Sequence, residues 1–188
     1  MGGGRILRPP PSPARFDMMR DTYEAILRLK ALRSFEDRPV SDDDMDAVLE
    51  AARWTGSSKN RQNWSFIVVD DPIQRERLAG AGDFTAPIAA APATICLVQE
   101  PEGYEFDTGR VAQNIMLAAD ALGLATCPIT LHREEMAADI LDLPDGVRCR
   151  YAIAIGHASA GAAPKRFGGR KPIAELVHRN TYGSTATS

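Results

Sequence analysis

The chain has 188 residues, of which 44% are hydrophobic and 25% charged, as in a single globular domain with a sizeable core. Its 22 basic and 25 acidic side chains give a net charge of −3, which provides no electrostatic footprint for nucleic acid. No apolar run approaches the ~20 residues of a membrane span, and the N-terminus lacks the apolar region of a secretory signal. We therefore expect a cytoplasmic protein that binds neither nucleic acid nor membranes.

The residues that commonly hold metals or act as nucleophiles form no recognisable pattern. Three cysteines are odd in number and too widely spaced for a zinc knuckle, so we expect buried, reduced thiols. The histidines lack metal-ligand spacing, and neither Gly-x-Gly-x-x-Gly nor Gly-x-Ser-x-Gly occurs. The sequence thus indicates no metal site, no dinucleotide-binding fold and no serine hydrolase. The residues concerned are Cys96, Cys127, Cys149, His132, His157 and His178.

Domain organisation is simple. Residues 1–15 are rich in glycine and proline, which predicts a disordered segment. We expect one domain over residues 16–183 and a flexible tail over residues 184–188.

The first helix is expected from Asp21 to about Lys30, and a basic stretch follows it directly. The cations of this stretch are Arg28, Lys30 and Arg33. Positive charge near a helix C-terminus stabilises the helix through its macrodipole, so a purely structural role is open. The same three side chains could also clamp an anion.

A second helix is expected to begin after Ser41, because Asp44 three residues later makes a variant of the capping box. Met45, Val48 and Leu49 then follow at helical spacing and predict a face that packs on the core. This helix carries no candidate chemistry and serves as scaffold for the loop that follows it.

The loop over residues 54–64 reads Trp-Thr-Gly-Ser-Ser-Lys-Asn-Arg-Gln-Asn-Trp and has no apolar period. It lies between the second helix and a predicted strand over residues 65–69, and loops held between rigid elements often carry binding groups. A polar connector with a tryptophan anchor at each end is the alternative. The short side chains that could bind a ligand are Ser57, Ser58, Asn60, Gln62 and Asn63.

The rest of the chain alternates between helices and strands. Small residues on the helix that starts at Asp107 would let a second helix approach closely, although a helix buried within one subunit is the alternative. Near the C-terminus, Arg170 and Lys171 precede Pro172, either as an anion site or as solvated loop charges. The expected elements are a helix over 72–78, an irregular segment over 80–92, a buried strand over 93–98, a helix over 107–122, a strand or loop over 126–131, a helix over 134–141 and a strand over 150–155.

Four motifs in this chain resemble, in the same order, those of the nitroreductase family of flavoproteins. Residues 57–66 resemble the family signature Ser-x-x-Asn-x-Gln-Pro-Trp-x-Phe, although Gly56 and Asn63 stand where many members have proline. The basic stretch with Phe35, Pro39 and Val40 resembles the family's Arg-x-x-Arg-x-Phe-x-x-x-Pro-Val motif. The small-residue helix and the basic C-terminal end resemble the other two motifs, and the resemblance covers about residues 20–183.

The resemblance implies an α+β fold, a three-layer α-β-α sandwich around a mixed, mainly antiparallel sheet, assembled as a homodimer. It implies an enzyme that uses FMN to pass hydride from NAD(P)H, through flavin N5 and in ping-pong order, to an electron-poor acceptor such as a nitroaromatic or a quinone. No catalytic side chain is expected, because the flavin carries the redox chemistry. The short span between residues 70 and 107 leaves little room for a lid and implies an open site.

The resemblance also implies which residues contact FMN. The basic entry segment and the C-terminal end would hold the phosphate and ribityl chain, while the loop over residues 57–62 would reach the same FMN from the other subunit. Backbone N–H groups near Thr130 and Leu131 would face flavin N5. The implied set is Arg28, Lys30, Ala31 (a serine in many members), Arg33, Ser57, Ser58, Asn60, Gln62, Pro128, Ile129, Thr130, Leu131, Arg170 and Lys171.

Two other functions are compatible with the same scaffold, because a fold does not fix a reaction. The first is flavin-dependent dehalogenation or oxygen-dependent flavin chemistry. The second is flavin binding without turnover.

Overall fold

The computed structural model describes residues 22–165 and 168–184. The predicted disordered segment 1–15, the start of the domain at residue 16 and residues 185–188 of the predicted tail lie outside the described residues.

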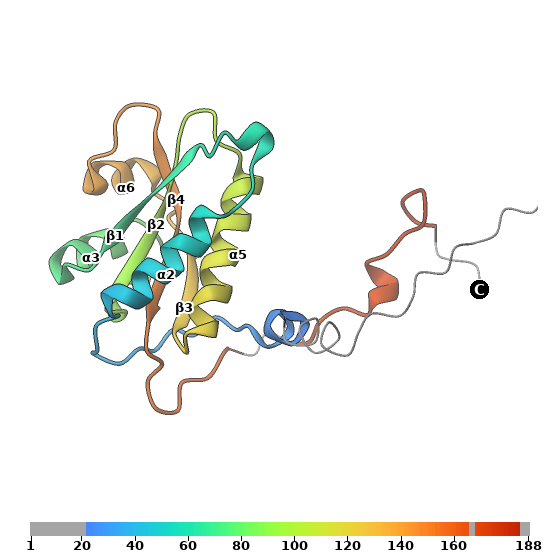
Figure 1. Ribbon diagram of the computed structural model, residues 1–188, viewed down its shortest axis with the longest axis horizontal. Helices are drawn as coiled ribbons and strands as arrows, with labels where there is room; N and C mark the ends of the chain where they lie inside the picture. The colour runs from blue at the N-terminus through green and yellow to red at the C-terminus, as the bar shows by residue number, and fades with distance from the viewer. Residues whose placement is uncertain (1–21, 166–167, 185–188) are drawn as a thin grey trace, which may run out of the picture.

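A four-stranded sheet forms the middle layer, in the order β1-β2-β4-β3 (Figure 1). Every neighbouring pair of strands is antiparallel, which confirms the mainly antiparallel sheet. Among the residues that the structure describes, one isolated parallel bridge joins Ala31 to Thr126 at the β3 edge, and this bridge makes the sheet mixed. The strands are β1 (Trp64–Val69), β2 (Ala93–Gln99), β3 (Ala125–Thr130) and β4 (Arg148–Gly156).

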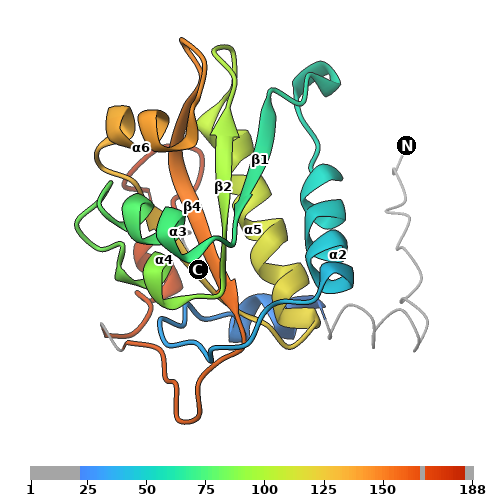
Figure 2. The same ribbon diagram turned by 90° about the vertical axis from the view of Figure 1, so that its left-hand side faces the viewer.

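Helices cover both faces of this sheet, which confirms the three-layer sandwich (Figure 2). One face packs against α2 (Asp42–Arg53) and α5 (Glu105–Ala121), and the other against α3 (Pro72–Ala79), α4 (Ala86–Ala90) and α6 (Glu134–Leu141). The side chains of successive β4 residues point to opposite faces of the sheet, as the strand period of two requires. Ile153 and Ile155 join the cluster with α2 and α5, whereas Ala152 and Ala154 join the other cluster.

The predicted elements over 72–78, 93–98, 134–141 and 150–155 are confirmed within two residues at each end. The irregular segment predicted over 80–92 is wrong in part, because it contains α4. That helix begins with a proline in its first turn and buries Ile88, and its small residues have no period long enough to read from sequence. The first helix covers residues 22–28 rather than extending to Lys30.

All three cysteines are free and buried, which confirms the expected thiols. Burial raises the pKa of the Cys127 thiol, and a hydrogen bond with Cys149, together with burial, raises that of Cys96. Among the helices that the structure describes, none is both long and apolar enough to cross a membrane.

Replacing Ser41 by alanine is expected to lower the free energy of unfolding by about 1 kcal/mol. The Ser41 hydroxyl accepts a hydrogen bond from the Asp44 N–H (3.2 Å) and donates one to the Asp44 carboxylate (2.7 Å), so the predicted cap of α2 is confirmed. Urea unfolding measures the loss, with Ser41→Asn as a control that keeps an acceptor at the cap. Equal stability of the alanine and asparagine variants would show that the cap contributes nothing.

Candidate functional site

A cavity of about 400 Å³ lies between the first turns of α5 and the strands β3 and β4. Its size falls within the ~300–1,000 Å³ that small-molecule sites occupy. A Cβ atom placed on Gly109 would meet no other atom within 4 Å, so glycine at this position leaves the space beside α5 open. The lining is mainly apolar and consists of Glu105, Thr108, Gly109, Ala112, Pro128, Ile129, Thr130, Tyr151, Ala152 and Ile153.

β3 is an edge strand, and its backbone register decides which groups face the open side. The Leu131 N–H donates to the Arg150 carbonyl (2.8 Å), so the odd-numbered residues of this segment pair with β4. The even-numbered residues turn their backbone groups outward, and the Thr126 carbonyl there accepts from the Leu32 N–H (2.9 Å). By the same alternation, the N–H of Thr130 points away from β4.

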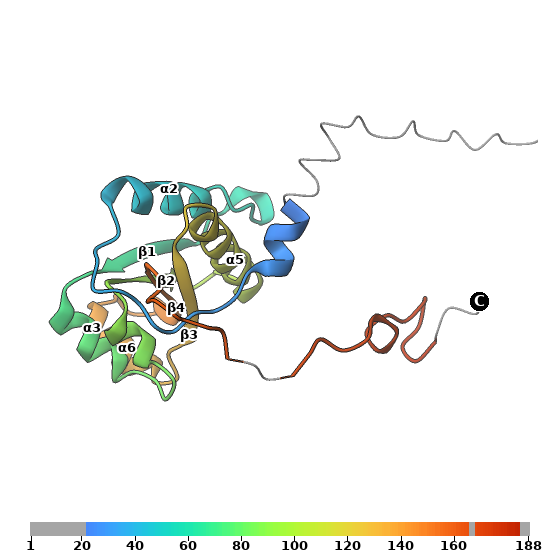
Figure 3. The ribbon, with the colours of Figure 1, turned by 90° about the horizontal axis from the view of Figure 1, so that it is seen from below.

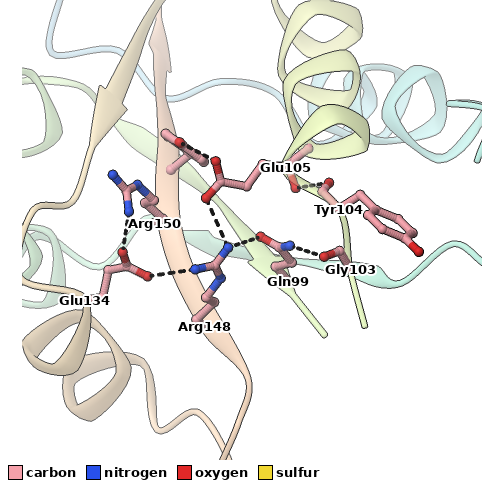
Figure 4. Close-up of polar contacts among 9 residues, drawn as sticks. Gln99, Gly103, Tyr104, Glu105, Glu134, Arg148 and Arg150 are labelled. Atoms are coloured by element: carbon pink, nitrogen blue, oxygen red, sulfur yellow. Dashed lines mark hydrogen bonds and ion pairs between the residues drawn. The ribbon is translucent and has the colours of Figure 1, made fainter. Parts of the chain in front are cut away.

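A network of two carboxylates and two guanidinium groups includes Glu105 of the cavity lining (Figure 4). Glu105 pairs with Arg148 (3.0 Å) and also accepts a hydrogen bond from the Tyr151 hydroxyl (3.4 Å). Glu134 pairs with Arg150 (3.0 Å) and lies 3.9 Å from Arg148. Because these charges balance and each pair is partly exposed, the network stabilises the fold only modestly and has no net charge.

A second cavity of about 270 Å³ lies at the other end of β3, beside Ala125 and Thr126. Arg28 and Lys30 line it, and each already has one partner. Arg28 pairs with Asp120 near the end of α5 (2.9 Å), and the Lys30 ammonium donates to the Leu27 carbonyl (2.9 Å). These bonds leave donors on both side chains, so this cavity could take an anion.

Ala31 and Arg33 lie on the same segment as the two cations. The bridge to Thr126 holds Ala31 against the start of β3. Arg33 is exposed, and its positive charge partly offsets the raised pKa of the nearby Cys127 thiol. Four of the predicted FMN contacts, Arg28, Lys30, Ala31 and Arg33, are thus brought together along the open edge of the sheet.

The loop over residues 57–63 has an unusual backbone. Ser58–Asn60 form a 3₁₀ turn, and Lys59, Asn60 and Gln62 have φ angles of 53°, 54° and 54°. Left-handed geometry costs a residue with a side chain roughly 1–2 kcal/mol. The Ser57 hydroxyl accepts from the Gln62 N–H (2.9 Å) and holds the two ends of the turn together. The loop predicted from sequence is therefore an ordered turn with partly exposed polar side chains.

Of the two tryptophans that flank this loop, Trp64 packs against the core, whereas Trp54 is 74% exposed. Trp64 begins β1, and the Trp54 indole N–H donates to the Glu50 carboxylate (2.7 Å). Hydrogen bonds from Arg53 and Trp54 lower the pKa of Glu50 to about 2.

Helix α5 separates the two groups of predicted contacts within one chain. Arg110 donates to the Gly56 carbonyl beside the loop, whereas Asp120 pairs with Arg28 beside the basic cavity. Ten residues of helix separate these two anchors, which is about 15 Å along the axis. A single chain therefore does not bring Ser57 and Asn60 next to Arg28 and Lys30.

The other predicted contacts fall in two places. Pro128, Ile129 and Thr130 line the apolar cavity, while the Leu131 side chain is fully buried in the core. Arg170 and Lys171 belong to the segment 168–184, which projects away from the sheet and its helices (Figures 1 and 3). The structure therefore does not bring this segment to the basic cavity. Large apolar side chains of this segment are exposed to solvent, with Ile173 73% and Leu176 58% exposed.

Sequence reasoning missed Glu105, Thr108 and Tyr151, the polar residues on the cavity wall. Two of them lie at the start of α5 and the third on β4, so only the tertiary fold brings them together. The Glu105 carboxylate accepts hydrogen bonds from Arg148 and from the Tyr151 hydroxyl, and the Thr108 hydroxyl donates to the Tyr104 carbonyl (3.3 Å). Among the described residues, no three His, Cys, Asp or Glu side chains cluster as metal ligands would.

This arrangement defines an α+β protein with an apolar cavity and a basic cavity at opposite ends of one open strand. Comparison with known proteins identifies the class further. The sequence model of the nitroreductase family matches residues 30–93 and 85–157, and the chain belongs to that family.

Several relatives match over most of the chain. The FMN reductase (NADPH) of Bacillus subtilis is 28% identical over 193 residues, which cover 87% of this chain and 75% of the relative. The oxygen-insensitive NADPH nitroreductase of Salmonella typhimurium is 28% identical over 184 residues, again covering 87% and 75%. Among solved structures, NfrA2 of B. megaterium superposes with a TM-score of 0.78 at 26% identity, covering 86% of this chain and 75% of its own.

Proposed function

We propose that this protein is an FMN-dependent oxidoreductase that transfers hydride from NAD(P)H to an electron-poor acceptor such as a nitroaromatic or a quinone. The observation that carries the proposal is the pair of cavities along the β3 edge. The apolar cavity suits a flat ring system, and the basic cavity suits a phosphate. Membership of the nitroreductase family and relatives named FMN reductase and NADPH nitroreductase support it.

The residues present fit FMN at both ends. Gly109 leaves room for a ring beside α5, and the outward N–H of Thr130 is available to a ring acceptor such as flavin N5. Arg28, Lys30 and Arg33 would hold the phosphate by charge-assisted hydrogen bonds, the strongest kind that a protein offers an anion. Leu131 is a weaker candidate than Thr130, because its N–H already bonds to Arg150.

FMN, when bound, supplies the two-electron carrier that accepts hydride from NAD(P)H and delivers it to the acceptor in ping-pong order. The protein contributes position and electrostatics. The apolar wall would exclude water from a bound ring, and Arg28, Lys30 and Arg33 would help to position it by holding the phosphate. Glu105 and Arg148 pair with each other, so an uncharged acceptor that bound beside them would not have to desolvate an unpaired charge.

The working unit in this proposal is a homodimer in which each FMN contacts both subunits. The separation of Ser57 and Asn60 from Arg28 and Lys30 along α5 supports it, since a second copy could supply the missing loop. Exposed apolar side chains also support it, with Tyr23, Ile26 and Leu27 of the helix over 22–28 at 64%, 51% and 57% exposure. Contact with a second chain would bury them. Arg170 and Lys171 would reach the phosphate in this assembly.

Purified protein tests the function directly. We expect yellow protein that releases FMN on denaturation and that oxidises NADH or NADPH anaerobically when menadione or a nitroaromatic is added. Acceptors of increasing size should react about equally, because the site is open. Colour without NAD(P)H oxidation would identify a flavin-binding protein. Turnover only with a halogenated substrate or only with oxygen would identify the other flavin chemistries, and protein without affinity for flavin would overturn the proposal.

A further inference from the structure

Two residues of α5 hold the chain immediately before the loop over residues 57–63. The Asn114 amide donates to the Thr55 hydroxyl (2.7 Å), and the Arg110 guanidinium donates to the Gly56 carbonyl. Thr55 is itself buried, with 4% of its surface exposed. The two donors are four residues apart and therefore share one face of the helix. Both bonds act on the two residues that lead into Ser57.

Arg110 is itself held in place. Its guanidinium lies 3.5 Å from the carboxylate of Asp107, three residues earlier on the same face, and that residue is only 8% exposed. The guanidinium also lies over the Phe106 ring, 5.8 Å from its centroid. A side chain fixed on two sides is a better anchor than a free one, because less entropy is lost when it bonds to the Gly56 carbonyl.

The loop needs such an anchor for two reasons. Its left-handed residues Lys59, Asn60 and Gln62 occupy unfavourable backbone geometry, which persists only where surrounding contacts hold it. In addition, glycine at position 56 allows the backbone that leads into the loop a wide range of φ and ψ angles unless another contact restrains it. A Cβ atom at that position would lie 3.2 Å from an Arg110 nitrogen, so glycine also allows the close approach.

We propose that Arg110 is a positioning residue, which acts through the Gly56 carbonyl to hold Ser57, Ser58 and Asn60 in the conformation that contacts FMN. This inference rests on the proposed function, because it takes the loop to be part of the flavin site. Arg110 orders the loop before FMN binds, so the entropy cost of ordering the loop is not subtracted from the binding free energy.

Arg110→Met removes the donor and keeps most of the apolar stem. We expect amide hydrogen exchange over residues 57–63 of the flavin-free protein to rise about tenfold, and FMN to bind about tenfold more weakly, as the loss of one charge-assisted hydrogen bond predicts. Exchange over α6 should stay unchanged. Arg53→Met is the matched control, because that arginine also lies close to the loop but bonds to Glu50 instead. Arg110→Lys should restore part of both effects.

A double-mutant cycle separates positioning from direct contact with FMN. In a Ser57→Ala/Ser58→Ala/Asn60→Ala background the side-chain contacts that Arg110 is proposed to position are already lost, so Arg110→Met should cost little further FMN affinity. A full, additive loss in that background would overturn the proposal, and so would unchanged exchange or unchanged FMN affinity in the single variant. If Arg110→Met fails to fold, Arg110→Gln, which is too short to reach the carbonyl, gives the same readouts. Wild-type protein without FMN affinity would instead overturn the proposed function, while the exchange result would still report on the anchor.

Discussion

A heterodimer of a Lys30→Ala/Arg33→Ala subunit with a Ser57→Ala/Asn60→Ala subunit is expected to recover about half the activity of the wild-type dimer. Each parent homodimer should be nearly inactive, since both of its sites carry a lesion. If each site is built from both subunits, one site of the heterodimer carries both pairs of substitutions and the other site carries none. The separation of the two groups along α5 is the structural reason to expect this geometry.

The measurement uses subunits with different affinity tags, mixed by co-refolding and purified through both tags in turn. A mixture of two wild-type preparations with the same tags controls for losses during refolding. If each site lay within one subunit, every site of the heterodimer would be damaged. Verified heterodimers no more active than the mutant parents would therefore rule out the shared site.

Replacing Arg33 by alanine is expected to weaken FMN binding roughly ten- to a hundredfold, because a hydrogen bond to a charged group contributes ~1.5–3 kcal/mol. Riboflavin, which has no phosphate, should bind almost as well to the variant as to the wild type. Fluorescence titration of the flavin-free protein with both ligands measures the difference.

Arg38→Ala serves as the control, because that arginine is also exposed and lies on the same segment, five residues further along. It should change neither affinity. Equal losses for FMN and riboflavin in the Arg33 variant would remove this residue from the phosphate site.

Local patterns predicted most of the scaffold from sequence. Ser41 and Asp44 marked the start of α2, and the continuous apolar run of β2 marked a strand buried on both faces. The helix α4 escaped prediction because five residues in an alanine-rich stretch show no period. Family motifs located the basic segment, the loop and the β3 segment, and they placed the chain in the nitroreductase family.

The remaining features of the site depend on contacts between distant parts of the chain. Glu105 and Tyr151 meet only because α5 crosses β4, and neither position carries a local signal for it. The bond from Arg110 to the Gly56 carbonyl joins residues 54 positions apart. Nor does spacing along the sequence reveal that α5 holds Ser57 and Lys30 apart, because separation in space depends on how the helix packs.

Pro128 has a consequence for the chain while the edge of β3 is uncovered. An exposed strand edge is a template on which other chains can add strands and aggregate. Pro128 lies in the middle of this edge strand, at an even-numbered position whose backbone faces outward. Since proline has no N–H, the edge lacks a donor there and pairs poorly with an incoming strand. A chain whose β3 edge is uncovered is thereby protected from adding strands along that edge.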